Sequence, residues 1–122
     1  MQTLILYRTD QKAFDIASLF KRLKERGYVQ KTCSDEVSEV VHLDLRLNDE
    51  QISADVLNPA DGITIRNSTP SAIRAMLTLA SCVDGCVRLC DTDNSFSISL
   101  AATTTVDSVL ASMMSGQHDP LA

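Results

Sequence analysis

Residues 40–56 read VVHLDLRLNDEQISADV, and apolar and polar side chains alternate on both sides of a polar break at 48–50. Because successive side chains of a strand point to opposite faces, this alternation predicts two half-buried strands joined by a turn. A third run, GITIRN at 62–67, repeats the pattern after the turn-forming segment NPADG at 58–62. Together the three runs predict an antiparallel meander with one face buried and the other face in water.

Further helices and strands are indicated on both sides of this meander. The expected helices begin after a capping side chain and end at a glycine or an Asp-Gly pair; they span 11–26 after Asp10, 70–83 after Thr69, and 106–115 after Thr105. Apolar, β-prone runs predict further strands at 3–8, 28–33, 86–90 and 96–100. The order β-α-β-βββ-α-ββ-α indicates an α+β fold. It predicts a largely antiparallel sheet of five to seven strands, with about three helices packed mainly on one face.

The bulk composition favours a single globular domain. The chain has 122 residues, of which 44% are hydrophobic and 22% are charged, as in ordinary globular proteins. We expect one α+β domain over residues 1–116 and a flexible C-terminal tail over 117–122. The opening residues lack the pattern of a signal peptide, and no apolar run approaches the roughly 18 residues of a membrane span. The expectation is therefore a cytoplasmic protein without a membrane partner.

The net charge of −5 is unevenly distributed. Residues 1–31 hold seven of the eleven basic residues against three acidic ones, and the remainder holds four arginines against thirteen acidic residues. Such asymmetry can mark a binding surface for an acidic partner, or simply one solvated basic helix. The acidic isoelectric point, near 4.8, disfavours nucleic acid as a partner.

Three of the four cysteines, Cys82, Cys86 and Cys90, are spaced four residues apart. On one strand Cys86 and Cys90 would lie about 13 Å apart at ~3.3 Å per residue, too far to share one zinc ion. The spacing also differs from the C-x-x-C of redox motifs. We therefore expect no metal site and no cofactor, and we interpret the cysteines as small, half-buried packing residues.

The polar face of the meander is the first candidate contact surface. Arginine suits bidentate recognition of carboxylates and is enriched at protein interfaces. The residues predicted to contact a partner protein on outward strand positions are His42, Asp44, Arg46, Asp55, Arg66 and Arg88. Cross-strand pairing of these charges within the sheet is the alternative interpretation.

The helix expected at 70–83 is the second candidate surface, because Arg74 is its one charged residue before Asp84. Its predicted inward stripe contains Ile73, Met76, Leu77, Ala80 and Val83. A helix without charge on its outer face is normally covered on both sides. The outer residues Ala75, Thr78, Leu79 and Cys82 are therefore predicted to form the interface of a homodimer, with cover from the third helix as the alternative.

The element order from Asp10 onward carries a resemblance. If 28–33 only leads into the meander, the order α-βββ-α-ββ-α is similar to that of type III secretion chaperones. The similarity is one of element order, and the strand at 3–8 does not belong to the pattern. It implies a dimer that binds unfolded segments of another protein, and small acidic immunity or inhibitor proteins share the same coarse features.

Two functional hypotheses follow. The first is a non-catalytic protein-binding module of the chaperone, immunity or inhibitor kind, acting through the polar sheet face and the weakly charged helix. The second is a small enzyme or ligand-binding protein that uses His42, Asp44 and Arg46, because a histidine beside a carboxylate can act as an acid–base pair. No motif places a nucleophile next to them, and we therefore expect the chain not to be an enzyme.

Overall fold

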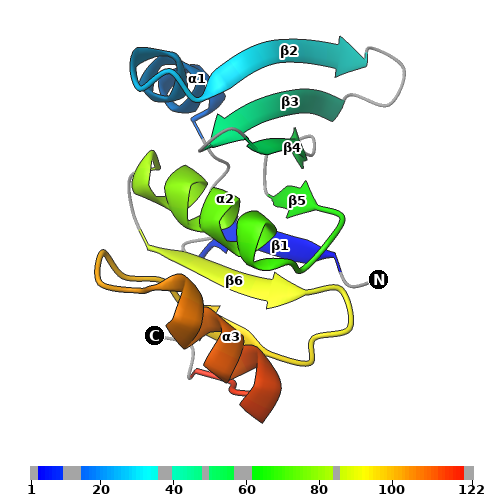
Figure 1. Cartoon of the computed structure of the whole chain (residues 1–122), viewed down its shortest axis with the longest axis vertical. Coiled ribbons are helices and arrows are strands. Elements are labelled where there is room, and N and C mark those ends of the chain that lie inside the picture. The colour runs from blue at the N-terminus through cyan, green and yellow to red at the C-terminus, as the bar shows by residue number, and fades with distance from the viewer. Residues whose placement is uncertain are drawn as a thin grey trace.

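The structure, a computed structural model, describes residues 3–9, 15–35, 40–47, 50–56, 62–83 and 86–119. The elements in these residues are β1 (Leu4–Arg8), α1 (Ile16–Glu25), β2 (Val29–Asp35), β3 (Val40–Leu47), β4 (Glu50–Val56), β5 (Ile63–Ile65), α2 (Pro70–Ser81), β6 (Val87–Asp91), β7 (Ser97–Ser99) and α3 (Val106–Ser115). Their order is the predicted β-α-β-βββ-α-ββ-α (Figure 1). The α+β fold class is therefore confirmed.

The strands form one seven-stranded sheet in the order β2-β3-β4-β5-β1-β6-β7 (Figure 1). Every neighbouring pair is antiparallel, and the predicted meander is β3-β4-β5. β1 comes first in the chain, yet it lies between β5 and β6, so that Leu6 is opposite both Ile63 and Leu89. The strand that begins the sequence therefore joins the meander to the C-terminal hairpin β6-β7.

One face of the sheet holds the apolar core. The alternation noted in the sequence places the aliphatic residues of the strands on this face, and the buried ones are Leu4, Leu6, Leu43, Leu45, Ile52, Ala54, Val56, Ile63, Ile65, Val87, Leu89 and Ile98. The helices contribute Leu19, Leu23, Ile73, Met76 and Val109 to the same cluster. Burial of each large aliphatic side chain contributes about 1.5–3 kcal/mol to folding.

Helix α1 begins later than the sequence indicates. The predicted cap, Asp10, lies outside the described residues, and Asp15 caps α1 instead by accepting hydrogen bonds from the backbone N–H and the hydroxyl of Ser18. These hydrogen bonds hold the pKa of Asp15 below its ordinary value, because they stabilise the carboxylate. The predicted end is confirmed: Gly27 follows the last turn with a φ of 75°.

Gly27→Ala is expected to lower the free energy of unfolding by about 1 kcal/mol, because a side chain at positive φ strains the backbone. An added Cβ would meet no atom within 4 Å, so no steric clash adds to this cost. Urea denaturation measures the change, and Glu25→Ala, at an exposed position of the same turn, is the control. A loss of more than about 3 kcal/mol would show that packing rather than backbone strain is at stake.

Helix α2 is covered more widely than the sequence indicates, and this overturns most of the predicted dimer surface. Ala75, Leu79 and Cys82 are buried within the single chain, and only Thr78 of the predicted interface is half-exposed. The reason is the central position of α2, which lies over β1 and β4 and packs beside α3 (Figure 1). A homodimer would need a different surface.

The C-terminal end of α2 contacts α1. Arg22 donates a hydrogen bond from Nη1 to the backbone oxygen of Cys82, and Arg26 donates one from Nη1 to Ser81 Oγ, each at 3.1 Å. The predicted inward residues Leu77 and Ala80 are half-buried, whereas Ala75 is fully buried. The helix is thus rotated relative to the prediction, because the stripe that includes Ala75 and Leu79 faces the core.

The chain does not fray directly after α3. Gly116, with a φ of 66°, ends the helix, and Gln117–Asp119 then runs parallel to β7 through a bridge between His118 and Ser97. Backbone hydrogen bonds to β7 hold these three residues, which belong to the tail predicted over 117–122. Residues 120–122 lie outside the described residues.

Candidate functional site

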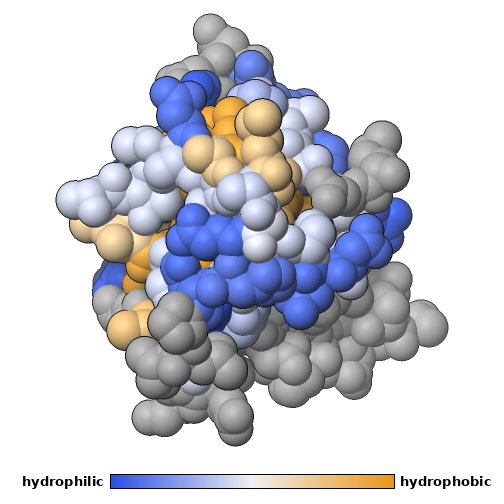
Figure 2. Space-filling model, turned by 90° about the horizontal axis from the view of Figure 1, so that it is seen from below, coloured by the Kyte–Doolittle hydropathy of each residue, from blue (hydrophilic) through white to orange (hydrophobic). Residues whose placement is uncertain are grey.

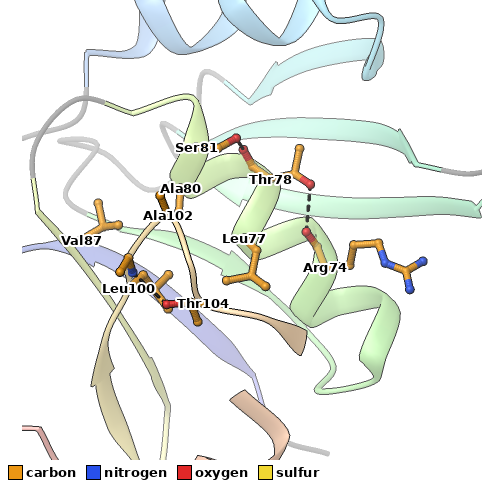
Figure 3. Close-up of a pocket in the computed structure, with 10 residues that line it drawn as sticks. Arg74, Leu77, Thr78, Ala80, Ser81, Val87, Leu100, Ala102 and Thr104 are labelled. Carbon is orange, nitrogen blue, oxygen red and sulfur yellow. Dashed lines mark hydrogen bonds between the residues drawn. The ribbon is translucent and has the colours of Figure 1, made fainter. Parts of the chain in front are cut away.

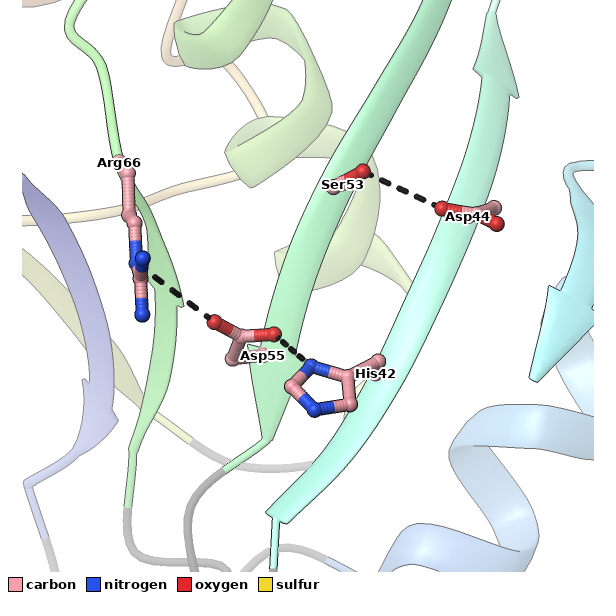
Figure 4. A network of polar contacts seen from close by, with 5 residues as sticks. All are labelled: His42, Asp44, Ser53, Asp55 and Arg66. Carbon is pink, nitrogen blue, oxygen red and sulfur yellow. Dashed lines mark hydrogen bonds and ion pairs between the residues drawn. The ribbon is translucent and has the colours of Figure 1, made fainter. Parts of the chain in front are cut away.

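The polar sheet face, defined here as the outward side chains of β3 and β4 with Arg66 just after β5, is the first candidate site (Figure 4). The register places His42 opposite Asp55, Asp44 opposite Ser53, and Arg46 opposite Gln51. These six residues lie on the face away from the apolar core because they alternate with the buried residues of their strands. The structure thus brings together five of the six residues predicted to contact a partner: His42, Asp44, Arg46, Asp55 and Arg66.

Asp55 is the centre of the contacts on this face (Figure 4). Its Oδ1 lies 2.5 Å from His42 Nδ1, and its Oδ2 lies 4.0 Å from Arg66 Nε. The side chain of Asp55 is 19% exposed, against 48% for His42 and 86% for Arg66. The two partners of Asp55, His42 and Arg66, therefore remain more open to solvent than the carboxylate does.

The carboxylate that pairs with His42 is Asp55 rather than the predicted Asp44. Residues directly opposite on adjacent antiparallel strands have Cβ atoms about 5 Å apart, closer than side chains two residues apart on one strand. Asp44 instead accepts a hydrogen bond from Ser53 Oγ at 3.2 Å (Figure 4). The sequence indicated the residue types but not the register that pairs them.

Arg88 is the one predicted contact residue that the structure removes from the solvent-exposed surface. Its side chain is only 1% exposed, so the prediction that it meets a partner directly on an open sheet face is wrong. Nη1 donates to Ser99 Oγ at 3.0 Å, and Nη2 donates to Ser97 Oγ at 3.1 Å and to the backbone oxygen of Asp119 at 2.7 Å. A buried guanidinium is tolerated here because oxygen acceptors replace the water that it loses.

The cysteines occupy three different environments. Cys82 is buried, Cys86 is exposed and precedes β6, and Cys90 is half-buried on β6. Burial raises the pKa of the Cys90 thiol, and the neighbouring Asp91 raises it further. Within the described residues, no group of three His, Cys, Asp or Glu side chains is arranged to hold a metal ion.

A groove of about 520 Å³ between α2 and residues 100–104 is the second candidate site (Figure 3). Its apolar wall is formed by Leu77, Ala80, Val87, Leu100, Ala101 and Ala102. The hydroxyls of Thr78 and Ser81 donate to backbone oxygens of α2, and Arg74 points away from the apolar wall (Figure 3). The sequence did not indicate this groove, because helical spacing placed Leu77 and Ala80 in the predicted inward stripe of the helix.

No family model, no curated protein and no solved structure matches this chain. Its function is therefore inferred from its own surface. The residues of the polar sheet face do not line the groove beside α2, nor do they line a second hollow between β7 and α3. Among the described residues, no helix has both the length and the apolar character that crossing a membrane requires.

Proposed function

We propose that this chain is a non-catalytic protein-binding module that contacts another protein through its polar sheet face. The observation that carries the proposal is the gathering of paired and exposed charges on three adjacent strands. His42, Arg46 and Arg66 are exposed there, and Asp44 and Asp55 are half-exposed beside them. A broad face of this kind suits contact with a second macromolecule better than the enclosure of a small molecule.

The chemistry of the face supports recognition by complementary charge. Planar guanidinium groups such as those of Arg46 and Arg66 can each bind a carboxylate with two hydrogen bonds. Asp55 already pairs with His42 and Arg66, which orients these side chains before a partner arrives. Exposed pairs of this kind contribute little to stability, about 0–1 kcal/mol, so the arrangement costs the fold little to maintain or to rearrange.

Among protein-binding modules, an immunity or inhibitor protein fits the charge better than a chaperone. The net charge of −5 favours encounter with a partner that is basic overall, such as a nuclease or a toxin, while Arg46 and Arg66 would bind individual carboxylates on its surface. Such proteins act by covering a surface on their target and need no catalytic group. A chaperone for unfolded segments would need an exposed apolar surface, and the groove beside α2 is the feature that would suit this role.

Reversing two charges on the face is expected to weaken partner binding by about 10- to 100-fold, the range seen when interface arginines are replaced. The variant is Arg46→Glu with Arg66→Glu. The control is Arg74→Glu on the exposed side of α2. It changes the net charge by half as much as the double variant does, at a position away from the sheet face.

The experiment captures partners from an extract of the source organism and then measures their affinity by calorimetry. The expected result is a stoichiometric partner that wild type and Arg74→Glu retain and the double variant loses. A partner that binds all three chains equally would place the interface elsewhere.

The alternative function, a small enzyme or ligand-binding protein, is favoured by one observation. His42 Nδ1 is held by Asp55, which leaves Nε2 of an exposed ring available as a proton acceptor. Asp44 and Arg46 follow it on the same face of the same strand. A His42→Asn variant that hydrolyses simple ester and phosphate substrates as fast as the wild type would exclude this alternative.

A further inference from the structure

The outer edge of β7 is occupied by the chain itself. Ser97 donates its backbone N–H to the backbone oxygen of Gln117 at 2.9 Å, and Asp119 donates its backbone N–H to the backbone oxygen of Ser97 at 2.8 Å. Gln117–Asp119 thus adds a short parallel strand to an edge that would otherwise expose its hydrogen-bonding groups. We call this three-residue stretch the C-terminal segment.

The edge also provides a specific seat for the side chain of Asp119. Its Oδ2 accepts a hydrogen bond from the backbone N–H of Ser99 at 2.9 Å, and its Oδ1 accepts one from Nε2 of Gln117 at 2.6 Å. The hydrogen bond from Gln117, which belongs to the segment itself, and the one from Ser99 hold the pKa of Asp119 below its ordinary value, and the charge of Arg88 lowers it further. The edge contributes the N–H of Ser99 and the charge of Arg88, and both favour a carboxylate at this position.

Arg88 lies beneath the segment as part of the same seat. This nearly fully buried guanidinium donates to the backbone oxygens of Ser97 and Asp119, as well as to the hydroxyls of Ser97 and Ser99. Contacts to backbone oxygens do not depend on the side chains of the segment. The edge thus recognises an extended backbone in general and one acidic side chain in particular.

The C-terminal segment is held by hydrogen bonds and buries little apolar surface. Gln117 and His118 are exposed, and the described surface at this end of the molecule shows a band of hydrophilic residues beside apolar patches (Figure 2). A segment held by hydrogen bonds without an apolar core of its own opens at a lower free-energy cost than the core of the fold does. Gly116, in the left-handed conformation, joins the segment to α3 and offers a point at which the chain can turn away.

We propose that the outer edge of β7 is a binding site for an extended acidic segment of a partner protein, and that the C-terminal segment occupies it in the partner's absence. The partner strand would run parallel to β7 and place a carboxylate where Asp119 now lies. This is recognition by strand addition, in which backbone hydrogen bonds supply affinity and one side-chain position supplies specificity. The site is separate from the polar sheet face and does not depend on the function proposed for that face.

The tethered C-terminal segment competes with a free peptide for the edge of β7 at an effective concentration in the millimolar range. A free peptide must displace it, so weakening the tethered segment strengthens binding of the peptide. The probe is a fluorescent peptide of residues 116–122, GQHDPLA, titrated into the full-length chain. The variant Asp119→Ala is expected to bind it about 10-fold more tightly than the wild type does.

Two controls accompany this measurement. Asp107→Ala, which removes an exposed carboxylate in the first turn of α3, is expected to bind the peptide as the wild type does. A peptide with alanine in place of its aspartate is expected to bind the Asp119→Ala chain about 10-fold more weakly, since it lacks the seated carboxylate.

Amide NMR spectra of the wild-type chain provide a second readout that needs no variant. The unlabelled peptide is expected to shift the amide resonances of Gln117 and Asp119, which it displaces from β7, before those of α1. Equal affinity of wild type and Asp119→Ala for the peptide, or shifts that spare the C-terminal segment, would overturn the proposal. If two copies of this chain exchanged their C-terminal segments, the wild type would form a dimer that Asp119→Ala abolishes. That result would show that the edge of β7 binds a second copy of the chain, and it would overturn the proposal of a different partner protein.

Discussion

Ala75→Lys is expected to unfold the chain at 25 °C. Ala75 has no exposed surface, and α2 is held between the sheet and its neighbouring helices. A lysine there must bury an ammonium group without a counter-ion or force the helix out of its place, at a cost of several kcal/mol. Since small domains are stable by only about 5–15 kcal/mol, this single change is large enough to remove the native state.

Circular dichroism and thermal denaturation measure this outcome, and Thr78→Lys is the matched control. Thr78 lies on the next turn of α2 and is half-exposed, so a lysine there can extend into solvent at a cost of about 1 kcal/mol or less. The dimer surface expected from the sequence predicts a different result, namely a folded Ala75→Lys chain that no longer self-associates. If sedimentation showed a folded, monomeric Ala75→Lys chain, the result would support the dimer surface expected from the sequence. It would contradict the burial of Ala75 against the core.

The second large effect is expected for Arg88→Met, which should lower the free energy of unfolding by about 3 kcal/mol. Methionine fills much of the volume but donates no hydrogen bonds. The oxygens of Ser97, Ser99 and Asp119 that accept from Arg88 would lose their donor in a buried setting. The C-terminal segment is expected to detach first, because one of these oxygens belongs to it.

Urea denaturation measures the loss of stability, and hydrogen exchange at the amide of Asp119 reports detachment of the segment. Arg66→Met is the control, since Arg66 is highly exposed and its removal should cost less than about 0.5 kcal/mol. If both variants were destabilised equally, the buried position of Arg88 would be wrong.

The comparison of Arg66 with Arg88 shows where sequence patterns stop being informative. Both arginines occupy outward strand positions by alternation, and the pattern treats them alike. Arg66 follows the short strand β5, where its guanidinium is open to solvent, whereas Arg88 lies on β6 between β1 and β7. Whether an outward position is exposed to solvent depends on which distant segments pack against it. The spacing of residues within a strand carries no information about this.

The amino-acid sequence by itself determined the local elements. Alternation defined the meander β3-β4-β5, and the caps Thr69 and Thr105 with the stops Gly27 and Gly116 defined helix ends, because such signals act within a few residues. Only the tertiary structure decided that β1 lies between β5 and β6, that Ala75 and Leu79 of α2 face the core, and that Asp55 rather than Asp44 pairs with His42. These outcomes depend on which segments, some of them more than fifty residues apart, bury the most apolar surface together, and no short stretch of sequence contains that information.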